Sequence, residues 1–460
     1  MFKALLGWLF GRKQPAPRPR AGDLEGFQRL NREAPLRAAS SDAGAVAVAA
    51  DTTTFLCREA VLGRNQRIAG YQFMLREGAR AHIRHSSRNI HHVYAEVLVR
   101  SLVNADVGEL LGERLAFIDL PDSFLAHPSI AGLPARNVVI MPVVLSDPGA
   151  PDPAALSATV AALRTRGLRL ALPDPTVVTE LAHLLPQAEF IVAQAEGMDA
   201  RRGLRLSNIA LEVAHDARLL VRGLPSVDEF RFAYKLGASL FQGPFVTSRE
   251  DWSDRQPGPS TARIGALIAR LRADADTREL AGLLKQDAAL SLRLLRYINS
   301  AANALPQAVS SIEHALALLG REKLHRWLIL LVCSAERGDG RGGAALETAL
   351  VRGRMMELLG TGWPVLERDA LFLVGLLSLV DVIMQVPLDR ALAPLALSPA
   401  IEAALRGSDS PYQPLLALAV ACERGENEDV QAAATACGIR PEQASECHMQ
   451  ALSWTMQIQD

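Results

Sequence analysis

Short apolar runs recur between residues 52 and 250, and stretches of helical periodicity separate most of them. Apolar runs of this length are typical of β-strands that are covered on both faces. Helical periodicity is strongest in residues 86–103, 154–166, 176–185 and 226–236. The predicted strands are residues 55–62, 68–75, 115–120, 137–145, 168–173, 190–195, 218–223 and 240–246.

The order of these elements predicts the architecture of the first half. Asn65 lies in the turn between the first two runs, which predicts that they form a β-hairpin. The later runs alternate with helices, as parallel strands joined by helical crossovers do. Eight strands in this order suit a TIM-type barrel. We therefore predict an α/β barrel over residues 52–250.

The second half has a different pattern. Residues 251–261 contain two prolines, a glycine and three small hydroxyl residues, which is typical of a linker. From residue 262 onward nearly every segment has helical periodicity, beginning with a stripe formed by Ile264, Leu267, Ile268 and Leu271. We predict an all-α domain over residues 262–457.

Charge and cysteine content exclude several classes of protein. The 49 basic and 50 acidic residues leave a net charge of -1, which argues against a nucleic-acid partner. The five cysteines form no CxxC pair, so a reducing cytoplasm suits the chain better than secretion, and no metal or other cofactor is expected. No run of about 18 apolar residues predicts a transmembrane helix.

Residues 1–51 form a separate segment. Phe2, Leu5, Leu6 and Leu9 fall at helical spacing, and a basic stretch rich in proline and alanine follows them. An apolar face beside basic residues can lie on an anionic membrane surface. A frayed tail, or a helix docked on the protein's own surface, is the alternative. We predict an amphipathic segment and linker, and weak membrane contact through residues 1–20 stays open.

Residues 280–331 resemble the HDOD domain, an output module of bacterial signalling proteins. Asp287, Asn299, Ser300 and Gly320 match the pattern of that family, as do residues 369–381 and 421–429. A Ser-Ile helix start and a Leu-Gly helix end complete the match at Ser311, Ile312, Leu319 and Gly320. The resemblance covers about 190 residues and implies a helical, HD-like fold.

The first half resembles an EAL domain, the barrel that cleaves cyclic di-GMP. Residues 71–76, YQFMLR, stand where that family has its Glu-x-Leu-x-Arg motif, and residues 236–246 stand where it has its final Gln-Gly strand. Together the two halves resemble the EAL–HDOD two-domain signalling family.

The resemblance also locates the residues that a metal-dependent phosphodiesterase would need. Cleavage with two metal ions requires several oxygen ligands at the carboxyl ends of barrel strands. Only Asp119 and Asp174 align as carboxylates, and Arg222 would bring a fixed positive charge to a metal position. The remaining ligand positions carry Gln72, Met141, Pro173, Val192, Gln194 and Pro225. We predict that hydrolysis is lost and that no metal is bound.

Residual ligand binding rests on a few matching positions. Arg76 aligns with the motif arginine and could contact a phosphate, and Gln242 aligns with the motif glutamine and could contact a base. Asp119 and Asp174 complete this candidate ligand set. The alternative is that Arg76 and Gln242 serve the fold alone. In the helical domain, Ser378 and Leu379 stand where an HD hydrolase has its His-Asp pair, so hydrolysis is not expected there either.

These observations lead to one functional hypothesis. We predict a non-catalytic, cytoplasmic signal-transduction protein, a degenerate EAL-like barrel joined to an HDOD domain, whose partners are other signalling proteins. The resemblance implies regulation of motility, biofilm formation or stress responses. The alternatives are a receptor that binds cyclic di-GMP without hydrolysis, or an active cyclic di-GMP phosphodiesterase. The oligomeric state stays open.

Overall fold

The structure is a computed structural model. It describes residues 56–75, 87–104, 107–146, 149–212, 214, 217–299, 309–335, 340–424 and 427–459. The predicted amphipathic segment and linker of residues 1–51 lies outside the described residues, as do Arg76 and Ser300.

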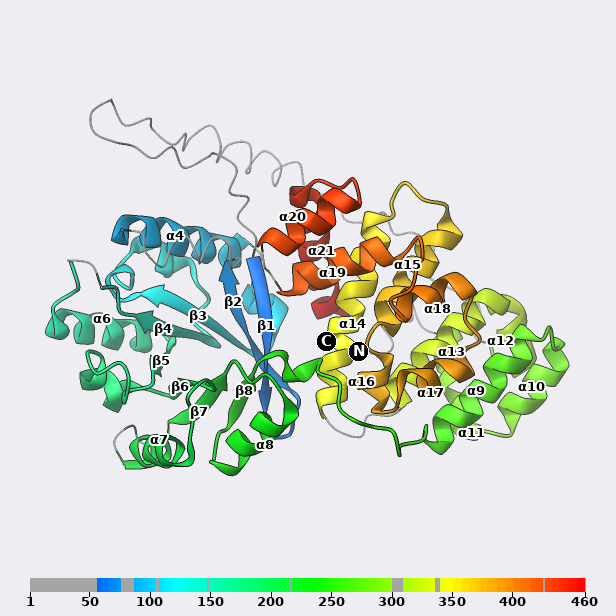
Figure 1. Cartoon of the computed structure of the whole chain (residues 1–460), viewed down its shortest axis with the longest axis horizontal. Helices are drawn as coiled ribbons and strands as arrows, with labels where there is room; N and C mark the ends of the chain where they lie inside the picture. The colour runs from blue at the N-terminus through cyan, green and yellow to red at the C-terminus, as the bar shows by residue number, and fades with distance from the viewer. Residues whose placement is uncertain are drawn as a thin grey trace. The chain divides into compact units, whose positions relative to one another are not determined.

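Eight strands close into a barrel in which each strand pairs with its sequence neighbours (Figure 1). Strands β2 to β8 run parallel, whereas β1 is antiparallel to both β2 and β8. The strands are β1 Leu56–Gly63, β2 Ile68–Leu75, β3 Leu115–Pro121, β4 Val138–Val143, β5 Arg169–Pro173, β6 Phe190–Gln194, β7 Arg218–Arg222 and β8 Leu240–Gln242. All eight predicted strands and the barrel are confirmed.

The predicted hairpin joins β1 to β2. Asn65 Oδ1 accepts a hydrogen bond from the amide of Arg67 at 3.1 Å, and the amide of Gly63 donates to the carbonyl of Arg67 at 2.9 Å. A turn this short can only join antiparallel strands. The orientation of β1 therefore follows from the turn at Asn65.

Alternating side chains of the strands divide the barrel into an interior and a helix-facing layer. In the interior, the rings of Phe117 and Phe190 meet edge to face with their centroids 5.3 Å apart. The interior cluster consists of Val61, Leu115, Phe117, Val139, Met141, Ala171, Phe190, Val192, Leu220 and Leu240. The interior of the barrel is thus packed with apolar side chains, and polar side chains lie at the ends of the strands.

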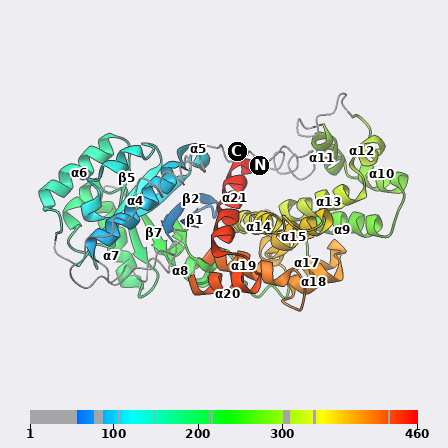
Figure 2. The ribbon, with the colours of Figure 1, turned by 90° about the horizontal axis from the view of Figure 1, so that it is seen from above.

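Helices connect the parallel strands, and Figure 2 shows α4 lying across the outside of the barrel. These elements are α4 Arg88–Asn104, α5 Val107–Leu111, α6 Pro153–Thr165, α7 Ala200–Glu212 and α8 Val227–Lys235, with 3-10 turns η1 Asp122–Phe124, η2 Pro128–Gly132, η3 Ala182–Gln187 and η4 Pro244–Val246. The helix predicted over residues 176–185 is wrong, because only η3 forms there. Pro186 lies inside that turn and has no N–H to donate to the carbonyl of Ala182, so an α-helix could not continue through it.

All described secondary structure after residue 258 is helical. Helix α9 begins at Pro259, inside the predicted linker 251–261, because proline is favoured in the first turn of a helix. The helices are α9 Pro259–Arg272, α10 Thr277–Lys285, α11 Ala288–Ile298, α12 Ile312–Leu319, α13 Arg321–Ala335, α14 Gly340–Leu359, α15 Val365–Leu377, α16 Val380–Met384, α17 Leu388–Leu392, η6 Ala393–Leu395, α18 Pro399–Leu405, α19 Gln413–Arg424, α20 Asn427–Ala436 and α21 Pro441–Gln459. The predicted all-α second half is confirmed.

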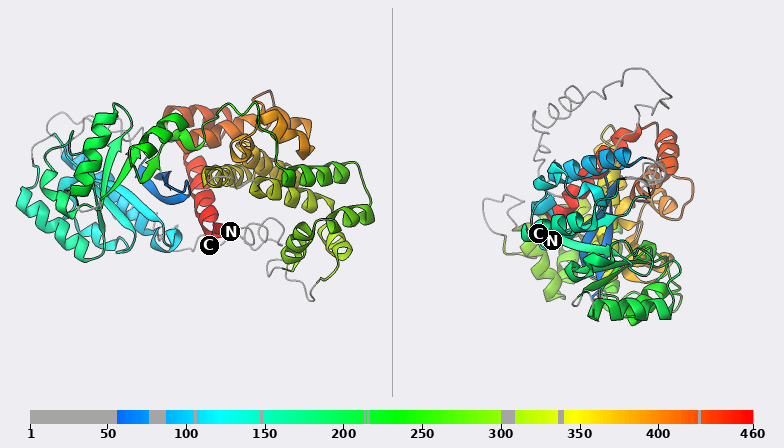
Figure 3. Two further views of the ribbon diagram at one scale, coloured as in Figure 1. Left: turned by 90° about the horizontal axis from the view of Figure 1, so that it is seen from below. Right: turned by 90° about the vertical axis from the view of Figure 1, so that its left-hand side faces the viewer.

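The chain divides into two compact units. One contains Ala275–Trp327, in which α10, α11 and α12 pack on one another. The other joins Thr54–Asp274 to Leu328–Asp460, so the barrel and helices α14 to α21 share one unit. Within this second unit, α14 contacts β1 and β2, and the red C-terminal helix α21 packs against α14 (Figure 3). None of the described helices is long and apolar enough to cross a membrane.

Candidate functional site

An ion pair occupies the interior of the barrel where strands β3 and β7 end. Nη1 of Arg222 lies 2.8 Å from Oδ2 and 3.1 Å from Oδ1 of Asp119. The two side chains are 6% and 14% exposed. A pair that is buried to this extent is held in place by the large penalty for leaving either charge alone.

Amide side chains extend the ion pair across the neighbouring strands. Nε2 of Gln72 donates to Oδ2 of Asp119 at 2.9 Å. Nε2 of Gln242 in turn donates to Oε1 of Gln72 at 2.6 Å and to Oε2 of Glu59 at 2.5 Å. Residues from β1, β2, β3, β7 and β8 therefore form one hydrogen-bonded network, which we call the barrel network: Glu59, Gln72, Asp119, Arg222 and Gln242.

Glu59 is a carboxylate that the sequence analysis missed. It lies on β1, directly opposite Gln72 in the strand register and two residues from Val61, which is part of the barrel interior. Side chains two residues apart on a strand share a face. The alternation of side chains along β1 could therefore have predicted that Glu59 points into the barrel. Glu59 therefore adds a carboxylate to the network that lies outside the aligned ligand positions, among which Asp119 and Asp174 were the predicted carboxylates.

Asp174 follows β5 and binds its own loop. Oδ1 of Asp174 accepts hydrogen bonds from the amide of Thr176 at 2.8 Å and from its hydroxyl at 2.6 Å. Oδ2 accepts from Nε of Arg202 at 2.7 Å, and Nη2 of the same guanidinium also lies 2.7 Å away. This carboxylate thus attaches the first turn of α7 to the end of β5.

None of the other aligned positions in the described part of the chain carries a carboxylate. Met141 on β4 and Val192 on β6 belong to the buried interior cluster. Pro173 ends β5, Gln194 ends β6, and Pro225 lies exposed after β7. Arg76, the motif arginine, lies outside the described residues.

The residues present do not fit a centre of two divalent cations. Such a centre needs several free carboxylate oxygens close together. Here Arg222 neutralises Asp119, Arg202 neutralises Asp174, and Glu59 accepts a hydrogen bond from Gln242. In the described part of the chain, no group of three or more His, Cys, Asp or Glu residues is arranged to hold a metal ion.

The residues that match the HDOD pattern begin and end helices. Oδ1 of Asp287 accepts from the amide of Leu290 at 3.0 Å and caps α11. The side-chain amide of Asn299, at the other end of α11, donates to the carbonyl and accepts from the amide of Val309, both at 2.7 Å. Gly320 ends α12 with a φ of 75°, which favours glycine. These positions therefore determine local backbone structure.

The region where an HD hydrolase has its His-Asp pair also carries arginines. Nη1 of Arg352 donates to Oγ of Ser378 at 3.0 Å, and its Nε and Nη2 donate to the two carboxylate oxygens of Glu423 at 2.6 and 3.0 Å. Asp381, buried two residues after Leu379, pairs with Arg249 at 2.5 Å. Both acids described here, Glu423 and Asp381, are therefore paired with arginines.

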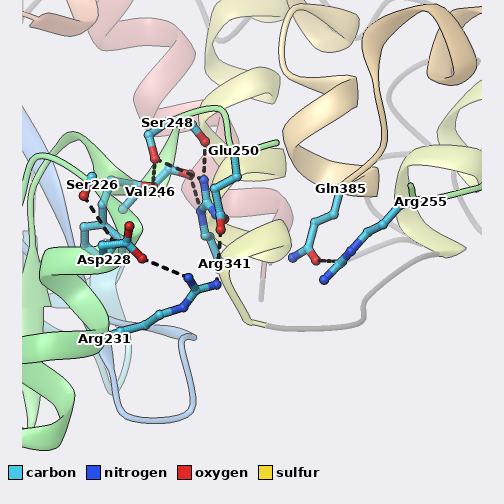
Figure 4. Close-up of polar contacts among 10 residues, drawn as sticks. Ser226, Asp228, Arg231, Val246, Ser248, Glu250, Arg255, Arg341 and Gln385 are labelled. Carbon is cyan, nitrogen blue, oxygen red and sulfur yellow. Dashed lines mark hydrogen bonds and ion pairs between the residues drawn. The ribbon is translucent and has the colours of Figure 1, made fainter. Parts of the chain in front are cut away.

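Arg341, at the start of α14, contacts the segment that follows β8 (Figure 4). It donates to the carbonyl of Val246 at 3.4 Å, to the carbonyl and hydroxyl of Ser248, and to the carboxylate of Glu250. Arg231 on α8 donates to Glu250 as well, at 3.2 Å. Charged side chains thus attach α14 to the end of the barrel.

A second charged cluster joins α14 to the outer face of β1 and β2. Glu347 is 2% exposed and accepts a hydrogen bond from the Tyr71 hydroxyl. Nη2 of Arg58 lies 3.2 Å and Nη1 of Arg114 lies 3.6 Å from its carboxylate oxygens. We call these four residues the Glu347 cluster. Burial, followed by the charge of Glu347, raises the pKa of Tyr71. The hydroxyl therefore stays protonated and donates to the carboxylate.

Acidification is expected to destabilise the protein through His448 on α21. Burial, and then the charge of Arg58, lower its pKa from 6.5 to about 3. The unfolded chain binds a proton at this ring below about pH 6.5, whereas the folded chain does so only near pH 3. Stability is therefore lost as the pH falls through this window, by on the order of 2 kcal/mol at pH 5.

Urea denaturation at pH 7 and pH 5 measures this effect. The matched variant is His448→Gln, which removes the titrating ring while keeping a polar side chain of similar size. We expect the loss of stability between the two pH values to be smaller in the variant. An equal loss in both proteins would contradict the assignment to His448.

Comparisons with known proteins match part of the helical half to one family and most of the chain to two relatives. The model of the HDOD domain family matches residues 261–392. Cyclic di-GMP phosphodiesterase CdgJ of Vibrio cholerae is 23% identical over 408 residues, which cover 88% of this chain and 93% of that protein. The uncharacterised protein YuxH of Bacillus subtilis is 21% identical over 412 residues, which cover 88% of this chain and 99% of that protein.

Solved structures of EAL proteins are similar to part of this chain. An EAL domain protein from Listeria monocytogenes covers 42% of this chain and 86% of its own length at 11% identity, with a TM-score of 0.34. A standalone EAL protein from Vibrio cholerae, in its form bound to cyclic di-GMP, covers 42% of this chain and 91% of its own length at 14% identity, also with a TM-score of 0.34.

Proposed function

Because this chain is an EAL–HDOD two-domain protein related to cyclic di-GMP signalling, we propose that it is a signalling protein that has lost phosphodiester hydrolysis and acts through contacts with other proteins. Regulation of motility, biofilm formation or stress responses is the expected setting. A scaffold for protein contacts needs the folded surface of the domain but not the metal-binding residues that hydrolysis requires.

The ion pair between Arg222 and Asp119 carries the proposal. Metal-assisted hydrolysis needs cations that polarise the phosphate and activate a water molecule. The buried guanidinium of Arg222 lies within 3.1 Å of both carboxylate oxygens of Asp119. It neutralises this carboxylate and repels a metal cation. Gln72, also bonded to Asp119, is an uncharged ligand at best. This network supports a structural role for the residues at the ends of the strands.

Incubation of the purified chain with cyclic di-GMP, in Mg²⁺ and separately in Mn²⁺, tests the loss of hydrolysis. We expect no linear dinucleotide above the level of a protein-free control. The chain's own control is Asp119→Asn: activity that survives this change comes from a contaminant. Turnover that the wild type shows and Asp119→Asn lacks would overturn the proposal and identify an active phosphodiesterase.

Calorimetric titration with cyclic di-GMP separates a scaffold from a receptor. The amide nitrogen of Gln242, the predicted base contact, already donates to Gln72 and Glu59, and its side chain is buried. We therefore expect no binding heat. Micromolar binding without turnover would instead identify a receptor and would direct mutagenesis to Arg76 and Gln242.

A further inference from the structure

A short segment that begins at a residue of the barrel network joins the end of the barrel to helix α14. Gln242 ends β8, and the turn η4 begins two residues later. Arg341, in the first turn of α14, binds this segment at positions between four and eight residues after Gln242. A connection of so few residues has little slack, so a displacement of Gln242 is passed on unless the backbone between the two residues gives way.

The backbone between Gln242 and η4 has little freedom to give way. Gly243 has a φ of 147°, and a Cβ atom at this position would lie 2.4 Å from the amide nitrogen of Leu224. That amide donates to the carbonyl of Gln242 at 3.0 Å, and the carbonyl of Leu224 accepts from the amide of Phe245 at 3.1 Å. Leu224 and Phe245 are each 1% exposed. The end of β8 and the start of η4 are therefore both fixed to the loop that follows Arg222.

Arg341 holds the other end of this segment through all three nitrogens of its guanidinium (Figure 4). Its side chain is 4% exposed. It donates to the carbonyl of Val246 at 3.4 Å, to the carbonyl and hydroxyl of Ser248, and to the carboxylate of Glu250. A planar guanidinium bound to three residues cannot turn without breaking several hydrogen bonds together. We therefore expect this contact to hold or to release as a unit.

A second connection from the barrel network ends at the same carboxylate. Arg222 ends β7, and Ser226 caps helix α8 four residues later. Arg231 of that helix donates to Glu250 at 3.2 Å. The loops that follow β7 and β8 thus both lead to Glu250, which also binds Arg341.

Helix α14 continues from Arg341 into the helical half. One face of α14 packs against α15, α19 and α21. Three turns after Arg341, Arg352 binds Glu423 on α19 and Ser378 at the end of α15. Packed helices move as bodies between discrete arrangements and do not deform continuously. A change at the start of α14 is therefore felt by the helices packed on it.

We propose that Arg341 couples the barrel network to the helical half: it passes a change at Gln242 to α14, and a change in α14 back to the barrel. Coupling between two sites is reciprocal, so an event at either end biases the other. The inference concerns communication within the chain and goes beyond the proposed function. It holds whether or not the barrel hydrolyses cyclic di-GMP.

Hydrogen exchange on the whole chain, followed by mass spectrometry, tests this coupling. Gln242→Met removes the two hydrogen bonds that the side chain donates and has a similar size. We expect the amides of residues 340–348, the first turns of α14, to exchange at least about threefold faster in this variant. Arg341→Gln alone should raise exchange in the same residues, and adding Gln242→Met to it should raise exchange no further.

Asp174→Asn is the matched control, because it breaks a buried ion pair with Arg202 at another strand end of the same barrel. It should leave exchange in residues 340–348 unchanged. Equal acceleration by the control would mean general loosening, and no acceleration by Gln242→Met would mean no coupling. An effect of Gln242→Met that persists in Arg341→Gln would show that α14 responds through another contact, such as the Glu347 cluster. Each of these three outcomes would overturn the proposal.

The reverse direction gives a second measurement that needs no change in the barrel network. Arg341→Gln is expected to speed exchange about threefold in β7, Arg218–Arg222, a strand that none of the described hydrogen bonds of Arg341 reaches. Asp174→Asn and wild-type protein set the background in the same peptides. Unchanged exchange in β7 would reduce Arg341 to a local structural contact and would overturn the proposal.

Discussion

Replacing Glu347 by alanine is expected to lower the free energy of unfolding by about 3–5 kcal/mol, the usual result of removing one partner of a buried charge pair. The change leaves Arg58 buried beside Arg114 with no carboxylate between them, and the Tyr71 hydroxyl loses its acceptor. Glu347→Gln keeps an acceptor oxygen in the same place, so we expect an intermediate loss.

Urea denaturation followed by circular dichroism measures this loss. The matched control is Glu113→Ala, because Glu113 also pairs with an arginine, Arg136, but is 82% exposed. A surface pair of this kind contributes about 0–1 kcal/mol. If Glu347→Ala destabilised the protein no more than Glu113→Ala, the Glu347 cluster would have no special role in stability.

Replacing Arg222 by glutamine is the second change with a large expected effect. It removes the guanidinium beside the buried carboxylate of Asp119, to which the amide of Gln72 still donates, and leaves Glu59 nearby in the same network. We expect a loss of about 3–5 kcal/mol in the free energy of unfolding, since a buried carboxylate without a counter-charge is poorly solvated.

A double-mutant cycle with Asp119→Asn tests whether the loss of stability in Arg222→Gln comes from the broken ion pair. The double variant Arg222→Gln/Asp119→Asn removes both charges and leaves amides that can hydrogen-bond to each other. We expect it to be more stable than Arg222→Gln alone, with a coupling energy toward the upper end of about 0.5–3 kcal/mol. Purely additive effects of the two substitutions in the same urea titrations would show that the ion pair is not the reason for the loss.

Much of the barrel could be predicted because it depends on local signals. Short apolar runs identified all eight strands, and Asn65 identified the turn of the hairpin. The pairing of β1 with β8, which closes the barrel, joins Val61 to Gln242 and has no local signal. Helix boundaries were harder to predict. Leu181, Leu184 and Leu185 of the periodic segment 176–185 are buried, yet only the 3-10 turn Ala182–Gln187 forms there, with Pro186 inside it.

The candidate site was predicted in part for a similar reason. Alignment with a known motif placed Arg222 and Asp119 at ligand positions, and the structure brings them together. Glu59 was missed because it lies outside the motif, although the alternation of β1 places it inside the barrel. The contact of Tyr71 with Glu347 spans 276 positions in the sequence, and no local pattern predicts a contact over that distance.

The hairpin also has a consequence for folding during synthesis. The hydrogen bond from Gln242 to Glu59 joins residues 183 positions apart. At about 5–20 residues per second, the ribosome therefore needs about 10–40 s to make the strand that pairs with the free edge of β1. Through that interval the nascent hairpin has an open edge and an unburied polar face, which is a template for wrong pairing. A chaperone that holds this hairpin until β8 emerges would increase the yield of native protein.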